Sequence, residues 1–394
     1  MAPFSMFLAL QPQLREAWQL SNTATGWISS GYFTGYMVAV PVLVSLTDRY
    51  DARTIWLGST TIAVGAALGF GLTASGVWTA LLFQFLAGAS LAGTYMPGLK
   101  LIADRIEGVL HPRFVAFYTT SFTIGAGVSF YLIGQLDASL DWRTAVALSA
   151  GGPAAAWVLA YSFLRPLRPG SDLDFRTKAT AGGRIAFENR DLTPAHHWRA
   201  VVRSPDVIRY VVGYACHTWE LFAVRAWLVP FLAFCELRLG DSGLGSTATL
   251  AAIISLFGVP ASLVGAELTT RIDRRRLVTS VMWLSAGASV LFGLSSATTW
   301  GVILTMSLVH SATVSADSAA LTSGMVAVSA PESRGTAMAL YSMAGFGAAS
   351  LGSFAVGGLL DLLGGESVLN WTIGFALIGA PNVVSALVVG RARR

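Results

Sequence analysis

The sequence contains the charged turn Leu46-Thr47-Asp48-Arg49-Tyr50-Asp51-Ala52-Arg53. A related turn, Leu268-Thr269-Thr270-Arg271-Ile272-Asp273-Arg274-Arg275, follows slightly more than half a chain length later. Each turn lies between two long apolar runs. A charged turn that is repeated between hydrophobic segments is typical of membrane transporters built from internal repeats. We therefore expect the two halves of the chain to share one architecture.

The composition excludes an ordinary soluble protein. Hydrophobic residues make up 54% of the 394 residues and charged residues only 12%, whereas soluble domains average about 25% charged residues. The apolar residues occur in runs of about 20, the length that crosses a hydrocarbon core roughly 30 Å thick. The sequence has no phosphate-binding loop and no metalloprotease or serine-hydrolase motif. We therefore expect neither an enzyme nor a bound cofactor or metal.

The apolar runs predict an all-α membrane protein with about twelve transmembrane helices, arranged as two six-helix bundles related by a pseudo-two-fold axis. Residues 1–165 would form the N-terminal bundle and residues 207–394 the C-terminal bundle. The first run is too short for one crossing, so we expect the chain to begin inside its first membrane helix. The approximate segment cores are 1–14, 24–46, 54–74, 77–102, 113–136, 143–164, 207–234, 244–269, 277–296, 300–328, 335–362 and 369–390.

Residues 166–206 form the only long polar stretch and are expected to be a linker between the two bundles. Within it, Thr193-Pro194 indicates the start of a short amphipathic helix that would lie on the membrane face. Arginine is concentrated in this linker, at the C-terminus and in the loops that follow even-numbered segments. Because basic loops face the cytoplasm, we expect both termini to be cytoplasmic, in a multi-pass protein of the bacterial inner membrane.

The turn at residues 48–53 resembles the G-x-L-a-D-R-x-G-R-K/R signature of the major facilitator superfamily, at its expected place between helices 2 and 3. Asp48, Arg49 and Arg53 match the signature, whereas its glycine positions hold other residues. The resemblance implies alternating access, in which Asp48 closes the cytoplasmic side against the start of segment 11. Alternatively, the arginines could only fix orientation. The expected gating residues are Asp48, Arg49, Arg53, Arg271, Asp273 and Arg274.

Segment 207–234 carries the densest set of ionisable residues inside an apolar run. Glu220 and Arg225 lie near its mid-depth, and His217 is one helical turn from Glu220 on the same face. Because a charge inside the bilayer costs several kcal/mol, each of these side chains needs a partner or a function.

Segment 300–328 supplies a matching pair, since His310 and Asp317 are seven residues apart and share a helix face. A carboxylate and a histidine on each of two inward-facing helices could relay a proton. The predicted proton-coupling residues are therefore Glu220, Asp317, His217 and His310. Alternatively, these four side chains and Arg225 could simply pair with one another and lock the C-terminal bundle.

A single arginine at mid-membrane suits a monovalent anion. The stretch from His217 to Trp227 resembles the cyanate/nitrate-type permease branch of the superfamily. Aromatic residues could line the cavity, although each could instead serve in packing or as an interface anchor. The predicted substrate contacts are Arg225, Tyr32, Tyr36, Tyr118, Phe122, Trp227 and Tyr341.

The sequence thus favours a secondary active transporter that moves a small organic or inorganic anion by proton-coupled alternating access, as a symporter. One alternative is an efflux antiporter for drugs or metabolites. An alternative of another class is a non-transporting membrane receptor or assembly factor on the same fold. The expected partners are a small-molecule substrate, protons and the lipid bilayer, with no nucleic acid, and the protein is expected to be monomeric.

Overall fold

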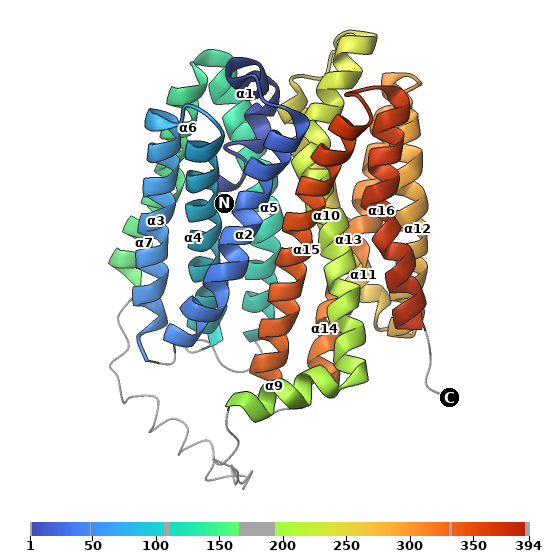
Figure 1. The fold of residues 1–394 in the computed structure, drawn as a ribbon. Helices are drawn as coiled ribbons and strands as arrows, with labels where there is room; N and C mark the ends of the chain where they lie inside the picture. Colours follow the sequence, from blue (N-terminus) through green and yellow to red (C-terminus); the bar gives the residue numbers. More distant parts are fainter. Residues whose placement is uncertain are drawn as a thin grey trace, which may run out of the picture.

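The structure is a computed structural model that describes residues 2–47, 49–103, 105, 111–164, 194–330 and 333–390. All regular elements in these ranges are helices, and most run side by side along one direction (Figure 1). The elements are η1 (Ala2–Phe4), η2 (Leu8–Leu10), α1 (Gln11–Trp18), α2 (Asn22–Leu46), α3 (Ala52–Thr73), α4 (Val77–Ala103), α5 (His111–Ser139), α6 (Trp142–Ser149), α7 (Gly151–Phe163), α9 (Pro194–Arg203), α10 (Pro205–Leu239), α11 (Thr247–Leu268), α12 (Arg274–Ser295), α13 (Trp300–Ala316), α14 (Ser318–Val328), α15 (Arg334–Leu362) and α16 (Val368–Gly390).

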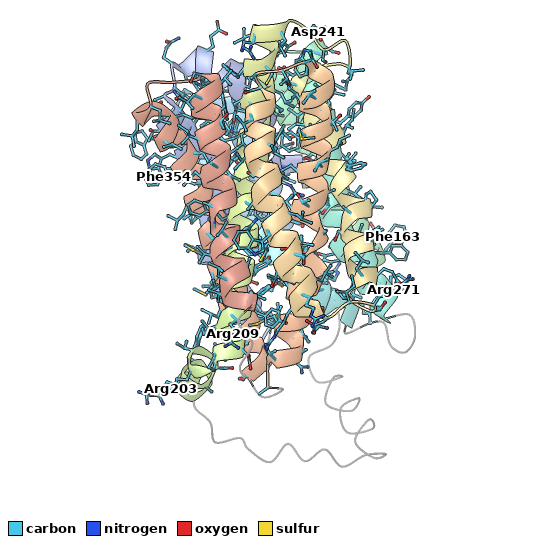
Figure 2. All side chains as sticks on the ribbon, turned by 90° about the vertical axis from the view of Figure 1, so that its right-hand side faces the viewer. Phe163, Arg203, Arg209, Asp241, Arg271 and Phe354 are labelled. Carbon is cyan, nitrogen blue, oxygen red and sulfur yellow. The ribbon has the colours of Figure 1, made fainter. Side chains whose placement is uncertain are left out.

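In the described part of the chain, eight helical stretches are long and apolar enough to cross a membrane. This agrees with the predicted all-α membrane architecture. The two ends of the bundle differ in charge. Figure 2 shows Arg203, Arg209 and Arg271 at one end, which we call the arginine-rich end, and Asp241 at the opposite end.

The two repeated turns begin helices in the same way. Asp51 is the N-cap of α3 and accepts a hydrogen bond from the backbone nitrogen of Arg53 at 3.0 Å. Asp273, at the corresponding place in the second turn, caps α12 and accepts from the backbone nitrogen of Arg276 at 3.1 Å. A carboxylate at this position satisfies a free backbone N–H and suits the positive end of the helix dipole.

The two halves of the chain meet through two helix pairs, α2 with α15 and α5 with α11. Figure 1 shows α2 and α15 side by side at the centre of the molecule. The second and eleventh predicted segments thus form one pair, and the fifth and eighth form the other. The repeat exchanges these two pairs, as expected for halves related by a pseudo-two-fold axis.

Glycines allow α2 and α15 to approach closely. A Cβ at Gly357 of α15 would lie 2.2 Å from the carbonyl oxygen of Asn22, and a Cβ at Gly26 of α2 would lie 3.0 Å from that of Ser353. Without a driving force from water, helices in a membrane associate through such close packing of small residues. Any larger residue at position 357 would therefore force the two halves apart.

Three predicted segments differ in detail from the structure. Residues 2–18 form η1, η2 and α1 rather than one helix, and Phe4 and Phe7 are fully buried among the neighbouring helices. The segment predicted at 143–164 divides into α6 and α7, and the segment at 300–328 divides into α13 and α14 at Asp317. The helix predicted after Thr193 is present as α9, which crosses the end of the bundle (Figure 1). Residues 165–193 of the linker lie outside the described ranges.

Candidate functional site

A cavity of about 410 Å³ lies between the two halves, on the arginine-rich side of their contacts. It is bounded by α2, α4 and α5 on one side and by α10, α11, α14 and α15 on the other. Aromatic and hydroxyl side chains form most of its wall. The lining residues are Tyr36, Tyr95, Met96, Thr120, Phe122, Thr123, Tyr214, His217, Thr218, Leu221, Phe222, Arg225, Val259, Ser262, Leu263, Ser318, Ala319, Thr322, Ser323, Ser342 and Phe346.

The opposite end is closed by polar contacts between the halves. Asp361, at the end of α15, accepts hydrogen bonds from the backbone nitrogen of Thr23 at 2.7 Å and from its hydroxyl at 2.6 Å. The same carboxylate accepts from the backbone and side-chain nitrogens of Asn22 at 3.1 and 2.9 Å. Arg15 and Glu366 add an ion pair. In this conformation the cavity is therefore cut off from the end that carries Asp241.

Among the residues that the structure describes, Arg225 is the only arginine or lysine that lines the cavity. Its side chain is held in α10 with 6% of the residue exposed, and its guanidinium carbon lies 5.6 Å from the centre of the Phe222 ring. No ion pair joins it to a carboxylate of the described residues, and its Nη1 atom has no hydrogen-bond partner there. The alternative in which all the buried charges pair with one another therefore does not hold for Arg225.

Glu220 lies one and a half turns from Arg225 on α10 and is 1% exposed. Its Oε1 atom is 3.1 Å from Nε2 of His310 on α13. Its Oε2 atom accepts hydrogen bonds from the hydroxyl of Ser285 on α12, at 2.8 Å, and from the amide of Asn382 on α16. The carboxylate thus joins four helices of the C-terminal half, and it does not line the large cavity.

His217 and Asp317 form the second carboxylate–histidine pair. Nδ1 of His217 is 2.8 Å from Oδ1 of Asp317, and both side chains are buried. The two atoms are at ion-pair distance, but they lack the alignment of a hydrogen bond. Asp317 stands at the break between α13 and α14, and His217 lines the large cavity. The four predicted proton-coupling residues therefore form two pairs, each joining α10 to the predicted segment 300–328.

Two of the predicted aromatic contacts, Tyr36 and Phe122, line the cavity. Tyr36 stacks on Phe346 with ring centres 3.7 Å apart. Tyr118 and Tyr341 stand behind the wall: Tyr118 stacks on Tyr95, and Tyr341 stacks on Tyr214. These two tyrosines can therefore orient the lining residues rather than reach a substrate directly.

The other two predicted contacts lie away from the cavity. Tyr32 lines a separate space of about 110 Å³ inside the N-terminal half. Trp227 is fully buried, donates its indole hydrogen to the carbonyl oxygen of Ser353 at 2.8 Å and packs on Trp371. Its position beside Arg225 in the sequence is misleading, because residues two apart on a helix point about 200° apart.

Several residues of the site were not predicted from the sequence. Ser285 and Asn382 complete the bonds to Glu220, and Tyr214 and Phe346 line the cavity. A polar side chain in an apolar segment is the signal that could have identified Asn382. For the aromatic residues the sequence carries no such signal, because phenylalanine and tyrosine are common throughout the chain.

Three of the six residues expected to act as a gate make polar contacts within their own half, namely Arg53, Arg271 and Asp273. Asp48 lies outside the described ranges. Arg53 donates to the carbonyl oxygen of Tyr161 at 2.9 Å, and Arg271 pairs with Glu267 at 3.1 Å. Asp273 is engaged as a helix cap. The others in the expected set are Arg49, which is exposed in the first turn, and Arg274, the first residue of α12.

The ionisable groups of the site are distributed unevenly between the halves. His217, Glu220 and Arg225 belong to α10, and their partners His310 and Asp317 follow in the C-terminal half. Within the described ranges, the N-terminal half contributes only uncharged side chains to the cavity wall. The electrostatic properties of the cavity are therefore set by the C-terminal half.

A central cavity between two repeated helical halves, closed at one end, defines the class of alternating-access membrane transporters. The chain belongs to the Major Facilitator Superfamily, whose sequence profile matches residues 1–278. The helical architecture predicted from the repeated turn is that of this superfamily.

Relatives of the chain include human protein spinster homolog 1, which is 23% identical over 280 residues, covering 67% of this chain and 50% of the relative. A probable transporter of Streptomyces coelicolor is 26% identical over 292 residues, covering 71% of this chain and 63% of the relative. The chain thus spans about half the length of the spinster relatives that it matches. The expected likeness to cyanate/nitrate-type permeases finds no support among these matches.

Two solved structures show the same fold at low sequence identity. An inward-facing, unoccupied bacterial homolog of the human lysosomal transporter Spinster aligns with a TM-score of 0.71 and 15% identity, covering 98% of this chain and 91% of the other. The nucleoside transporter NupG aligns with a TM-score of 0.68 and 13% identity, covering 98% and 96%.

Proposed function

We propose that this protein is a secondary active transporter that moves an organic anion by proton-coupled alternating access. The observation that carries the proposal is the guanidinium of Arg225, which is buried, lines the large cavity and has no carboxylate partner among the described residues. We take the arginine-rich end as cytoplasmic, with both termini on that side of a bacterial inner membrane. In this conformation the cavity is then accessible from the cytoplasm.

The anion class follows from charge. A buried guanidinium keeps its proton, and its desolvation is offset only by a counter-charge and hydrogen bonds. A carboxylate can supply both, through two parallel N–H···O bonds. Phe222, whose ring lies next to the guanidinium of Arg225, and Leu221, one helical turn before Arg225 on the same cavity wall, are uncharged. A substrate carboxylate is therefore the natural partner of this arginine during transport.

The size of the cavity favours an organic anion over an inorganic one. At about 410 Å³ the cavity falls in the range of roughly 300–1,000 Å³ that holds drug-sized molecules. Its aromatic wall, formed by Tyr36, Tyr95, Phe122 and Phe346 among others, suits the apolar body of such a molecule. We therefore expect an aromatic or branched monocarboxylate to bind better than nitrate or cyanate. One structural neighbour is a nucleoside transporter, but a neutral nucleoside lacks the negative charge that would pair with Arg225.

Proton coupling is assigned to the two carboxylate–histidine pairs. His217 touches both the cavity and Asp317, so this pair can exchange a proton with water in the cavity. Glu220 and His310 lie deeper among the helices. Adding or removing a proton changes the net charge of each buried pair, and a buried charge is costly. Protonation therefore changes which conformation of the bundle is favoured.

Alternation then requires the closed end to open and the arginine-rich end to close. The contacts of Asp361 with Asn22 and Thr23 would break. At the other end, where α15 begins at Arg334, the two repeated turns would form the closing contacts. We propose that Asp48 approaches this helix start, whose free N–H groups favour an anion.

The test is uptake of labelled monocarboxylates into proteoliposomes, with and without a proton gradient. Arg225→Gln should abolish uptake, whereas Arg238→Gln, near the end of the same helix, should leave it near the wild-type rate. Uptake that survives Arg225→Gln would refute the anion site. Export of dyes in place of carboxylate uptake would favour the efflux alternative. A purified protein that binds a ligand without moving it would favour the receptor alternative.

A further inference from the structure

Arg225 also borders a second, much smaller space. This chamber measures about 20 Å³ and lies among α10, α11, α12 and α13, next to the Glu220–His310 pair. A space of roughly 10–15 Å³ is enough for one water molecule, so the chamber has room for a single water or a monatomic ion and excludes a carboxylate. Its polar lining residues are Arg225, His310, Ser255, Ser307, Ser311 and Ser315.

Two residues that line the chamber each have a polar atom that lacks a hydrogen-bond partner among the described residues. One is Nη1 of Arg225, and the other is the hydroxyl oxygen of Ser255, whose residues are 6% and 5% exposed. Two neighbouring hydroxyls already donate hydrogen bonds: Ser311 donates to the carbonyl oxygen of Ile254, and Ser307 donates to that of Leu304. Buried donors of this kind cost free energy unless something accepts from them.

The nearby carboxylate does not serve as the acceptor. Glu220 is engaged by His310, Ser285 and Asn382, and no ion pair joins it to Arg225. The guanidinium can only donate and the Ser255 hydroxyl is able to donate, so a single group that satisfies both must accept hydrogen bonds. A negative charge there would also offset the buried positive charge.

We propose that this chamber binds a chloride-sized monatomic anion held by Arg225 and Ser255. Six of the twelve lining residues, among them Leu221, Phe292 and Val314, are apolar. Apolar walls favour an ion that loses its water readily, so chloride and bromide should bind and the strongly hydrated fluoride should not. Sulfate and carboxylates are too large for the chamber.

The site has a consequence for transport, which rests on the proposed function. Arg225 borders both the chamber and the large cavity, so a halide and an organic anion would share one cation. Each would then lower the affinity of the other by the same factor, as linkage requires. Chloride would act as the counter-ion of Arg225 while the large cavity holds no substrate.

Thermal unfolding of the purified protein in detergent tests the site without any organic substrate. At constant ionic strength, replacing gluconate by chloride or bromide should raise the melting temperature in a saturable way. Ser255→Ala should raise the halide concentration at half-effect about tenfold, the loss expected for one hydrogen bond to a charged group. Ser262→Ala, on the same helix but lining only the large cavity, should leave it unchanged.

The Ser255→Ala variant shows whether the Ser255 hydroxyl binds the ion or has only a structural role. Removing an unpaired buried hydroxyl should not affect halide dependence if that hydroxyl only fills space. Ser307→Val, which adds bulk to the chamber, gives a second test if Ser255→Ala folds poorly. Bromide-soaked crystals should show an anomalous peak between Arg225 and Ser255.

The proposal is overturned by an unchanged melting temperature in halide, by an unchanged half-effect in Ser255→Ala, or by an anomalous peak confined to the large cavity. None of these measurements uses a carboxylate. A protein that binds halide but takes up no organic anion would therefore refute the proposed function and leave the halide site standing.

Discussion

Asp361, in the last turn of α15, accepts hydrogen bonds from both the backbone nitrogen and the hydroxyl of Thr23, in the first turn of α2. An anion is unfavourable at the C-terminal end of its own helix and favourable at the N-terminal end of another. The carboxylate therefore favours contact between the halves over separation. This bond stabilises the conformation in which the cavity is closed at that end.

Asp361→Asn should populate the conformation that is open at this end. Loss of the charge-assisted bonds should shift the equilibrium roughly tenfold, corresponding to about 1.4 kcal/mol. The measurement is the labelling rate of Ser30→Cys by a membrane-impermeant thiol reagent, after Cys216 and Cys235 are replaced by serine.

Asp137→Asn is the matched control for this experiment. Asp137 is the counterpart of Asp361 in the first repeat, and it accepts a hydrogen bond from Gln13 of its own half at 2.6 Å. Its loss should not alter the labelling rate at position 30. Equal acceleration in both variants would contradict a latch between the halves.

Gly357→Ala should open the same end by steric means. The added Cβ would lie 2.2 Å from the carbonyl oxygen of Asn22, which is backbone and cannot rotate away. Overpacking of this kind costs about 1–3 kcal/mol. Gly358→Ala is the control, because a Cβ there meets no atom within 4 Å. A similar labelling rate for both variants would show that the α2–α15 contact is looser than the structure indicates.

Glu220→Gln should separate substrate movement from the proton gradient. Glutamine can keep bonds to Ser285 and His310, but it cannot take up or release a proton. We expect accumulation driven by a pH gradient to be lost, while exchange of labelled for unlabelled substrate continues. Glu267→Gln, an exposed carboxylate on α11, should retain both activities. Full accumulation in Glu220→Gln would remove this residue from the coupling mechanism.

Substitutions at Asp273 can distinguish its role as a helix cap from its predicted role in gating. Asp273→Ala should lower stability by about 1 kcal/mol, because the backbone nitrogen of Arg276 loses its acceptor. Asp273→Asn keeps a capping oxygen and removes the charge. If Asp273→Asn has the wild-type melting temperature and transport rate, Asp273 acts only as a helix cap. Normal melting with impaired transport would indicate that the charge takes part in gating.

Much of the fold could be predicted from the repeated turn, because a repeat fixes which helices correspond. The pairing of α2 with α15 and of α5 with α11 agrees with that symmetry. The helix break at Asp317 was not predictable, because no proline or glycine stands there. Beside the break, Gly265 of α11 closely approaches the carbonyl oxygen of Ala316, a tertiary contact that a single sequence does not reveal.

The buried charges of the site could be recognised from the sequence, since a carboxylate or arginine in an apolar run is rare. The hydrogen-bond partners of these charges could not be recognised from the sequence. Ser285 and Asn382 reach Glu220 only because α12 and α16 are rotated to face α10. Rotation of a helix about its axis is set by packing against its neighbours, which a single sequence does not reveal.

The uneven distribution of ionisable groups makes the transport cycle sensitive to the membrane potential in a particular way. An elementary charge that moves across the whole membrane gains about 2.3 kcal/mol per 100 mV. Among the described residues, the N-terminal half contributes no charged side chain to the cavity wall, whereas Arg225 of the C-terminal half borders the cavity. On the proposed function, the electrical work of each cycle is therefore done mainly on Arg225 and on the substrate that it holds.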